Sequence, residues 1–526
     1  IVWLSGKMQV LKNVKANQFI TLNEKDATAN FKRTYSQSSF FEQTKSPITY
    51  KDSSKNINDF KRQPLLINPL SYSGPCLVKG DVNNDKLDDI YVGGNNGKAG
   101  CLYIQQSNGS FIQKQETCFE NDKASDDVDG LFFDANGDGY NDLYVVSGGY
   151  NNYDADDSLL QDRLYINDGK GKFTKNNNAL PLMHVSKSCV RMADINADGF
   201  PDLFVGGRVT PGQYPMAPRS YLLINNGKGN FTDATASIAP SVQNIGMVTD
   251  AAWLDLNNDN KQDLIIVGEW MPVTVFINNN GKLENKTNEY FDENYSGWWN
   301  KIAVTDLNKD GKQDLVIGNL GSNTQCKVSD KEPAELYYKD FDGNGTIEPI
   351  FCFYIQGKSY PFLSKDELVS QINSMSKKFQ HYQDYADATL QDVFTPEQLK
   401  NAGHLTANIL TTTYFERSNN GKFHIKNLPV QAQFSPVFTI TPIDYNKDGN
   451  EDLLLCGNIN HARLRFGNYD ANYGVLLKGD GKGNFTYINQ QQSGFKLKGD
   501  VRSVLNINNT LLFGIAQEDI NAYKLK

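Results

Sequence analysis

Several features of the common enzyme and membrane-protein classes are missing from this sequence of 526 residues. It has no run of about 18 apolar residues, so no helix is expected to span a membrane. It has no Cys-x-x-Cys pair, which argues against zinc and iron–sulfur sites, and no Gly-x-Ser-x-Gly or phosphate-loop motif. Its net charge of −9 argues against nucleic acid as a partner.

Histidine is also scarce, with five in the chain, and none pairs with another at metal-ligand spacing. His381 lies beside aromatic residues in a helical stretch, where packing or a surface position is a simpler interpretation than catalysis. We therefore expect a protein that is not an enzyme. Scattered Tyr, Arg and Asp side chains can still form a site that a sequence does not reveal, so the enzyme alternative stays open. The histidines are His184, His381, His404, His424 and His461.

The seven cysteines are expected to act mainly as small buried apolar residues. Cys76 and Cys189 each stand five residues before an acidic loop, inside an apolar stretch, and Cys456 follows such a loop. The remaining four are arranged so that two disulfides are possible, and sequence alone does not decide their pairing. These candidate pairs are Cys101–Cys118 and Cys326–Cys352.

One motif, Asp-x-Asn-x-Asp-x-x-x-Asp, occurs six times. Its side-chain oxygens stand at positions 1, 3, 5 and 9, and the main-chain carbonyl of position 7 can join them. This all-oxygen set suits Ca²⁺ better than Mg²⁺, which keeps its waters. The loops are not EF-hands, because no Glu stands at position 12 and strand-like sequence follows each loop. The predicted calcium loops are 81–89, 134–142, 194–202, 255–263, 306–314 and 444–452.

The Asp residues at positions 1, 5 and 9 of these loops make up 18 of the 61 acidic residues, and six bound Ca²⁺ would more than neutralise the charge of −9. Two loops lack glycine at position 6, where Lys86 and Asn260 stand, and we expect these two to bind more weakly. The predicted ligands, with the carbonyl donor fourth in each loop, are Asp81, Asn83, Asp85, Leu87, Asp89; Asp134, Asn136, Asp138, Tyr140, Asp142; Asp194, Asn196, Asp198, Phe200, Asp202; Asp255, Asn257, Asp259, Lys261, Asp263; Asp306, Asn308, Asp310, Lys312, Asp314; and Asp444, Asn446, Asp448, Asn450, Asp452.

The spacing of the loops indicates a repeat. Successive loops begin 53, 60, 61 and 51 residues apart as far as Asp306, in the range of one four-stranded propeller blade. An apolar strand enters each loop, a second such as DLFVGG leaves it, and two more follow around a Gly-containing turn. Repeated units of four antiparallel strands form a β-propeller. The entering strands are expected at 76–80, 130–133, 189–193, 251–254, 302–304 and 438–443.

The C-terminal segment predicts one further blade without a metal loop, from the strands VRSVLNI, TLLFGIA and INAYKL. The expected fold is therefore all-β: a seven-bladed β-propeller with calcium loops in six blades. Its last blade lacks a fourth strand near the C-terminus. We expect residues 65–70 to supply that strand and close the ring.

Blade five carries an insertion, at about 327–405, because 138 residues separate the fifth and sixth loops. Residues 364–403 have helical spacing, with a capping box from Ser364 to Glu367 and a short helix beginning at Pro396. N-terminal to this helical part, the spacing of the acidic loops occurs once more, with Glu as the last residue. This segment is either a seventh cation site or a plain polar turn. That site comprises Asp340, Asp342, Asn344, Thr346 and Glu348, and the apolar stripe of the helical part comprises Leu368, Ile372, Met375, Phe379, Tyr382 and Tyr385.

The domain organisation follows from these patterns. Residues 1–27 predict two or three short strands, with Trp3 and Phe19 as packing residues. Residues 28–63 are polar and predict a linker, and the propeller occupies 64–526. The chain begins without Met, and we expect it to be a fragment of a longer protein.

The loops and their DLxVGG strands resemble the FG-GAP/VCBS repeats of integrin-α-like propellers. The opening VWLSGKMQVLKNVKANQFITLNE resembles the C-terminal part of an ASPIC/UnbV domain. This opening, followed by LLINPLSYSGPCLVKG, the insertion with YADATL, and LPVQAQFSPV, is similar to large VCBS-repeat proteins of the Bacteroidota cell surface. The resemblance covers nearly the whole chain. It implies an exported outer-membrane protein, lipid-anchored through a missing N-terminal part and associated with a TonB-dependent nutrient transporter.

Candidate binding residues lie in loops beside the strands. Aromatic and Arg side chains in such loops suit protein or glycan recognition. The alternative is that they plug the face of the ring and pack on the insertion. They are Trp270, Trp298 and Trp299; Arg208, Tyr214 and Arg219; and, within 458–474, Arg463, Arg465 and Tyr469.

We expect the calcium loops to be structural, tying the first strand of each blade to the second. The leading hypothesis is a non-enzymatic, calcium-stabilised propeller that acts as a protein-interaction subunit of a complex at the bacterial outer membrane. The alternative is a carbohydrate-binding or carbohydrate-processing propeller, which would have a glycan as its partner.

Overall fold

The computed structural model describes residues 1–526 except 32–38, 53–56, 96 and 151–152. The chain divides into two compact units, 1–39 and 40–526. In the first unit, β1 (Lys7–Met8) pairs with β2 (Ala29–Asn30). Phe19, predicted to pack, is exposed instead, because a unit this small buries little apolar surface.

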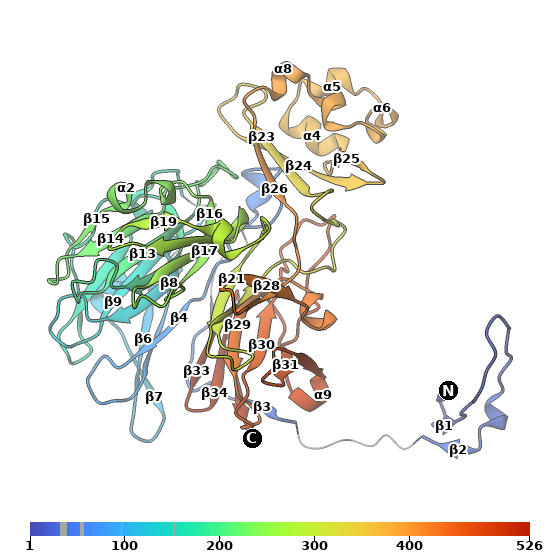
Figure 1. The fold of residues 1–526 in the computed structure, drawn as a ribbon, viewed down its shortest axis with the longest axis horizontal. Helices are drawn as coiled ribbons and strands as arrows, with labels where there is room; N and C mark the ends of the chain where they lie inside the picture. Colours follow the sequence, from blue (N-terminus) through green and yellow to red (C-terminus); the bar gives the residue numbers. More distant parts are fainter. Residues whose placement is uncertain (32–38, 53–56, 96, 151–152) are drawn as a thin grey trace. The chain divides into compact units, whose positions relative to one another are not determined.

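The second unit is built almost entirely from four-stranded antiparallel sheets, with short helices between them (Figure 1). The second strand of a sheet, counted in chain order, is continuous apolar sequence. In the second sheet this strand is β9 (Asp142–Gly148), which is buried along its whole length, as expected for a strand that is covered on both faces. The prediction of an all-β protein with repeated, propeller-like blades is confirmed. The sheets in chain order are β4 (Leu77–Gly80), β5 (Asp89–Val92), β6 (Cys101–Gln105), β7 (Phe111–Lys114); β8 (Asp126–Phe133), β9 (Asp142–Gly148), β10 (Arg163–Asn167), β11 (Phe173–Lys175); β12 (Ser186–Ala193), β13 (Asp202–Val209), β14 (Tyr221–Asn225), β15 (Phe231–Asp233); β16 (Met247–Leu254), β17 (Asp263–Pro272), β18 (Thr274–Asn278), β19 (Leu283–Asn285), with β20 (Ser296–Trp298) on β17; β21 (Lys301–Thr305), β22 (Asp314–Gly318), β27 (Thr413–Arg417), β28 (Phe423–Lys426); β29 (Val437–Ile443), β30 (Asp452–Gly457), β31 (Val475–Gly479), β32 (Phe485–Ile488); and β33 (Val501–Ile507), β34 (Thr510–Ile515), β35 (Asn521–Leu525), β3 (Phe41–Thr44).

The first strands of successive sheets lie against one another. β4 contacts β8, and the series continues through β12, β16, β21, β29 and β33, which contacts β4 again. Apolar side chains fill the spaces between sheets, as where Val146 of β9 packs with Val205 of β13. The approach is close enough to require glycine in places, because a Cβ at Gly206 would lie 2.6 Å from Val248 Cγ1.

The last sheet is completed from the other end of the chain, but by a different strand from the one predicted. β3 pairs with β35 along its whole length. Phe41 of β3 is 1% exposed and stacks on Phe495, with ring centroids 4.5 Å apart. The prediction that residues 65–70 supply this strand is wrong, and residues 41–44, assigned to a linker, are part of the sheet. The apolar residues of 65–70 are instead buried in other clusters.

The insertion lies between β22 and β27 and forms a sheet of its own, in the order β25-β24-β23-β26. Figure 1 shows this sheet and its helices beyond the ends of the other sheets. The bounds are β23 (Ala334–Lys339), β24 (Glu348–Ile355), β25 (Lys358–Pro361), β26 (Gly403–Ala407), α4 (Lys365–Gln371), α5 (Met375–Lys378), α6 (Tyr382–Ala386), α7 (Leu390–Val393) and α8 (Pro396–Leu399).

The helical part of the insertion is a series of short helices. Its predicted capping box at Ser364 and the start at Pro396 are confirmed, and further capping boxes at His381 and Thr389 begin new helices. The apolar stripe is buried from Leu368 to Phe379, whereas Tyr382 is 68% exposed. No helix in the described part of the chain is long and apolar enough to cross a membrane. The helices outside the insertion are α1 (Thr117–Asn121), α2 (Thr235–Ile238), α3 (Thr287–Tyr290) and α9 (Gln490–Ser493).

One end of the sheets is closed by a group of segments that we call the cover: residues 57–72, the insertion sheet and the loop 458–474. They share one apolar cluster with Trp270, Trp298 and Tyr214. These side chains are 3%, 5% and 1% exposed, and Trp299 is fully buried. Trp270, Trp298 and Tyr214 therefore pack with the insertion, as the alternative interpretation predicted, whereas Trp299 lies in a separate cluster with Phe415.

All seven cysteines are free thiols, and neither candidate disulfide forms. Cys76, Cys189 and Cys456 are buried, as predicted. The proposed partners Cys101 and Cys118 contact different groups: Cys101 Sγ accepts from Gln113, whereas Cys118 Sγ donates to a carbonyl at the start of β11.

Candidate metal centre

The six predicted loops occupy the same place in their sheets. Each connects the first strand to the second, and the residue before the loop pairs with its last Asp, as Ala193 pairs with Asp202. The second strands then run back toward the cover, so the loops lie at the opposite end of the sheets. The six connections are β4–β5, β8–β9, β12–β13, β16–β17, β21–β22 and β29–β30.

Within a loop, the oxygens of positions 1, 3 and 5 converge. In the third loop the Asp198 N–H donates to Asp194 Oδ1 at 3.1 Å and to Asn196 Oδ1 at 3.0 Å. Asp194 Oδ2 accepts from the Gly199 N–H at 2.9 Å, and Asp198 Oδ1 accepts from the Phe200 N–H at 2.9 Å. The same bonds recur in the other five loops.

The sharp turn of each loop requires a left-handed backbone conformation, with positive φ, at position 6. Glycine fills this place in four loops, but Lys86 has φ 69° and Asn260 has φ 62°. A left-handed conformation costs a residue with a side chain about 1–2 kcal/mol. Weaker binding at these two loops, expected from the sequence, remains a prediction.

The position-9 Asp has a different environment from the other carboxylates. Asp202 is fully buried, and its Oδ2 accepts from the Ile195 N–H at 3.0 Å while its Oδ1 accepts from the Asn225 N–H at 2.8 Å. It therefore ties the loop to the third strand. Burial raises its pKa to about 6, against the lowering effect of these bonds. The same burial and the same two bonds occur at Asp89, Asp142, Asp263, Asp314 and Asp452.

The structure thus brings positions 1, 3 and 5 together but directs position 9 toward the backbone. Among the described residues, the six loops contain no group of three carboxylates whose oxygens all lie within 4.8 Å of one another. A carboxylate oxygen that accepts one hydrogen bond still has a lone pair for a cation. The donor set, all oxygen and mostly anionic, fits Ca²⁺.

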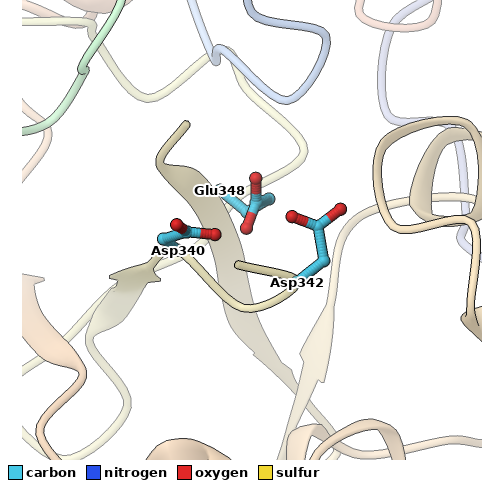
Figure 2. Close-up of side chains that lie close together, drawn as sticks. All are labelled: Asp340, Asp342 and Glu348. Atoms are coloured by element: carbon cyan, nitrogen blue, oxygen red, sulfur yellow. The ribbon is translucent and has the colours of Figure 1, made fainter. Parts of the chain in front are cut away.

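One carboxylate trio of that kind is found in the described chain, and it is the candidate seventh site. Figure 2 shows Asp340, Asp342 and Glu348 with their oxygens facing one another. Asp340 Oδ1 accepts from the Asn344 N–H at 3.0 Å, and buried Glu348 accepts from the Phe341 N–H at 2.7 Å. These bonds repeat the roles of positions 1 and 9. The pKa of half-buried Asp340 is lowered by its backbone donors, whereas burial raises the pKa of Glu348.

A set of side chains that the sequence analysis missed links four of the six loops to the next sheet. Asn225, at the end of β14, donates through Nδ2 to the carbonyl of Ala135 in the preceding loop at 2.9 Å. The recurring Asn at the end of LYIN, YLLIN and VFIN was the available signal. The equivalent bonds run from Asn167 to Val82, from Asn278 to Ile195 and from Arg417 to Leu256.

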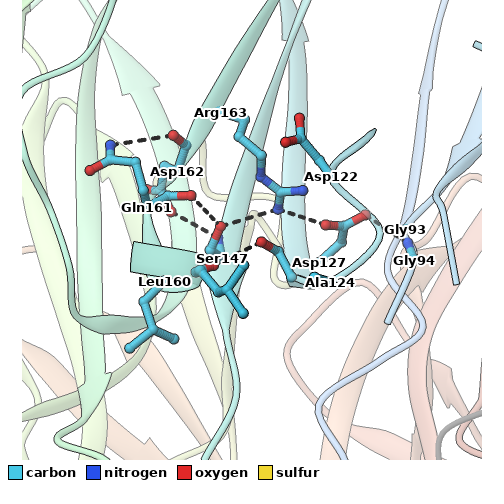
Figure 3. A network of polar contacts seen from close by, with 12 residues as sticks. Gly93, Gly94, Asp122, Ala124, Asp127, Ser147, Leu160, Gln161, Asp162 and Arg163 are labelled. Carbon is cyan, nitrogen blue, oxygen red and sulfur yellow. Dashed lines mark hydrogen bonds and ion pairs between the residues drawn. The ribbon is translucent and has the colours of Figure 1, made fainter. Parts of the chain in front are cut away.

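Buried charges also join neighbouring sheets, and no local motif indicates them. Arg163 donates to Asp127 Oδ1 at 2.6 Å and to Ser147 Oγ at 3.1 Å. Asp127 Oδ2 accepts from the Gly94 N–H of the preceding sheet at 2.7 Å (Figure 3). A series of ion pairs also connects the first strands of four successive sheets. It runs from Asp129 through Arg191 and Asp250 to Lys301.

Comparison with known proteins identifies the repeat. A family model described as an FG-GAP-like repeat matches residues 81–145, 134–205 and 255–317, and each match begins at the first Asp of one of the six predicted loops. No curated protein matches the sequence.

Several solved structures are similar at low identity. The V. cholerae biofilm matrix protein Bap1 is 12% identical, with a TM-score of 0.35, over 91% of this chain and 91% of that chain. Saccharomyces cerevisiae Sqt1 is 10% identical, with a TM-score of 0.39, over 86% of this chain and 99% of that chain. BBS1N, from its complex with ARL6DN, is 11% identical, with a TM-score of 0.28, over 76% of this chain and 91% of that chain. The three family-model matches show that residues 81–205 and 255–317 contain FG-GAP-like repeats.

Proposed function

We propose that residues 40–526 form a seven-bladed β-propeller stabilised by Ca²⁺ in six loops, with a seventh ion at residues 340–348. The closed series of contacts from β4 to β33 supports the ring. The converging oxygens of positions 1, 3 and 5 support the ions. Without a cation, each loop holds three carboxylates on one hairpin, and their repulsion opposes folding. A divalent cation converts that repulsion into attraction, so its binding energy becomes folding energy.

We further propose that this propeller is a non-enzymatic protein-interaction subunit of a complex at the bacterial outer membrane. The observation that carries this proposal is a surface formed by α4 and the loop 463–465, which ion pairs join. Glu367 of α4 pairs with Arg463 at 3.3 Å and with Arg465 at 2.8 Å. Leu464, between the two arginines, is fully exposed.

An exposed leucine held on both sides loses little conformational freedom on binding, which favours a protein interface. Arg465 also lies over the ring of Phe362, 4.2 Å from its centroid, so the loop is fixed to the insertion. The resemblance to Bacteroidota surface proteins supports the location, a lipid anchor, and a TonB-dependent transporter as the partner.

The test is a gentle purification of the full-length protein from its native envelope, followed by mass spectrometry. The wild-type protein should bring a transporter or another outer-membrane complex in stoichiometric amount. Leu464→Asp should lose that partner while keeping its melting temperature. Leu182→Asp is the matched control, because Leu182 is also exposed, at 76%, but lies outside the insertion. A wild-type protein that comes out alone would refute the proposal.

A further inference from the structure

The loop 458–474, part of the cover, is fastened to the last sheet at its first residues. The Asn460 N–H donates to Asp500 Oδ1 at 2.8 Å, and Arg502 Nη1 donates to the Asn458 carbonyl at 3.1 Å. Asp500 directly precedes β33 and is 2% exposed. A buried carboxylate therefore holds the start of the loop.

The next residue of the loop, His461, makes an incomplete contact with the same carboxylate. Its ring stacks on Tyr72, with the ring centroids 4.0 Å apart and the planes inclined by 14°. Its Nδ1 lies 3.7 Å from Asp500 Oδ2, which is beyond hydrogen-bond distance. Both atoms are buried, and neither has a hydrogen-bond partner among the described residues. An unpaired buried polar group costs free energy, so this pair favours any change that closes the gap.

Protonation of His461 supplies the missing donor. A neutral imidazole carries one N–H, and when this is on Nε2 the lone pair of Nδ1 faces the carboxylate, whereas an imidazolium has an N–H on both nitrogens. Closing the gap by about 1 Å then gives a charge-assisted hydrogen bond of normal length. Histidine is the side chain that changes charge between about pH 5 and 8. The bond is therefore present at low pH and is lost as the pH rises.

The other ionisable groups beside this contact make its surroundings negative. Arg502 Nη2 lies 3.4 Å from Asp500 Oδ2. Asp59, whose charge acts on Tyr72 from within the cover, is a second carboxylate. Burial raises the pKa of Tyr72, so its hydroxyl is neutral in this range. Two carboxylates and one guanidinium therefore lie around the stacked rings, and a positive charge on His461 is favoured.

We propose that His461 is a proton-dependent latch: when protonated it bonds to Asp500 and holds the loop 458–474 more tightly on the last sheet. The latch involves this chain alone. Because the same loop presents Leu464, the latch would also control the docking surface, and this extension rests on the function proposed above.

The test is amide hydrogen exchange of the full chain, followed by mass spectrometry of peptides that cover 458–474. His461→Gln keeps a hydrogen-bonding side chain but cannot gain a charge. At about pH 5.5 this variant should exchange about tenfold faster than the wild type in these peptides, because a hydrogen bond to a charged group is lost. At about pH 8 the two proteins should exchange equally, because the imidazole is neutral. Comparing the proteins at one pH cancels the intrinsic pH dependence of exchange.

Two further variants make the result specific. Asp500→Asn keeps an oxygen for the Asn460 N–H but removes the charge, so adding His461→Gln to it should have no further effect at about pH 5.5. His424→Gln is the matched control, because His424 is exposed on β28, in a different sheet, and it should leave exchange of 458–474 unchanged at either pH. Wild-type exchange in His461→Gln at the lower pH would overturn the proposal. An equal acceleration at both pH values would also overturn it, since the ring would then act only by packing on Tyr72.

Discussion

Removing calcium is expected to lower the melting temperature of residues 40–526 by about 15 °C. When the free Ca²⁺ concentration is one hundred times the Kd of a loop, binding at that loop adds about 2.7 kcal/mol to the free energy of unfolding. For a unit of this size, roughly 1 kcal/mol corresponds to 1 °C in the melting temperature. Six loops therefore predict a large difference between protein melted in excess Ca²⁺ and protein melted in chelator, measured by differential scanning calorimetry.

Two substitutions make this result specific to the loops. Asp198→Ala removes an exposed position-5 ligand and should reduce the calcium-dependent shift by about one loop's share, or roughly 2–3 °C. Asp480→Ala is the matched control, because exposed Asp480 also accepts from backbone N–H groups, at Lys482 and Asn484, but belongs to a Gly turn outside the predicted loops. It should leave the shift unchanged. A melting temperature insensitive to chelation would exclude the loops as stabilising calcium sites.

A chain that begins at Ser46, and therefore lacks β3, is expected to be strongly destabilised. Burial of Phe41 between Tyr445 and Phe495 is lost, and removal of a buried phenylalanine side chain alone costs about 3–5 kcal/mol. The backbone N–H and C=O groups of β35 that pair with β3 also lose their partners, and an exposed strand edge favours aggregation. Urea denaturation should show the lower free energy of unfolding, and light scattering the aggregation.

The matched control for this truncation is a chain that begins at Phe40. It retains β3 and loses residues 1–39, which form a separate compact unit, so its free energy of unfolding should equal that of the full chain. Phe41→Ala in the full chain should reproduce most of the loss. Equal stability of the chains starting at Phe40 and Ser46 would show that β3 does not close the last sheet.

The sequence predicted the parts of this structure that depend on short-range patterns. The six acidic loops connect first and second strands as expected, and the strands that enter them overlap the predicted ranges. The helix starts at Ser364 and Pro396 follow from local capping rules, and both are observed. Such features depend on residues within about one turn or hairpin of one another, so a single sequence contains the information.

The features that the sequence did not predict depend on contacts between residues that are distant in the chain. Phe41 and residues 65–70 are both apolar and lie in similarly polar surroundings, and only the packing against Phe495 favours β3 over the predicted segment. The bond from Asn225 to the preceding loop spans 90 residues, and the pair Arg163–Asp127 joins two strands that no motif connects.

The most direct measurement of the central claim is the number of Ca²⁺ ions bound per chain. The protein would be stripped with chelator, equilibrated by dialysis against millimolar Ca²⁺, and analysed for metal and protein content. The account predicts six ions, or seven if residues 340–348 form a site, and Asp198→Ala should bind one fewer. Binding of one ion or none would contradict the proposal that the repeated loops hold the propeller together.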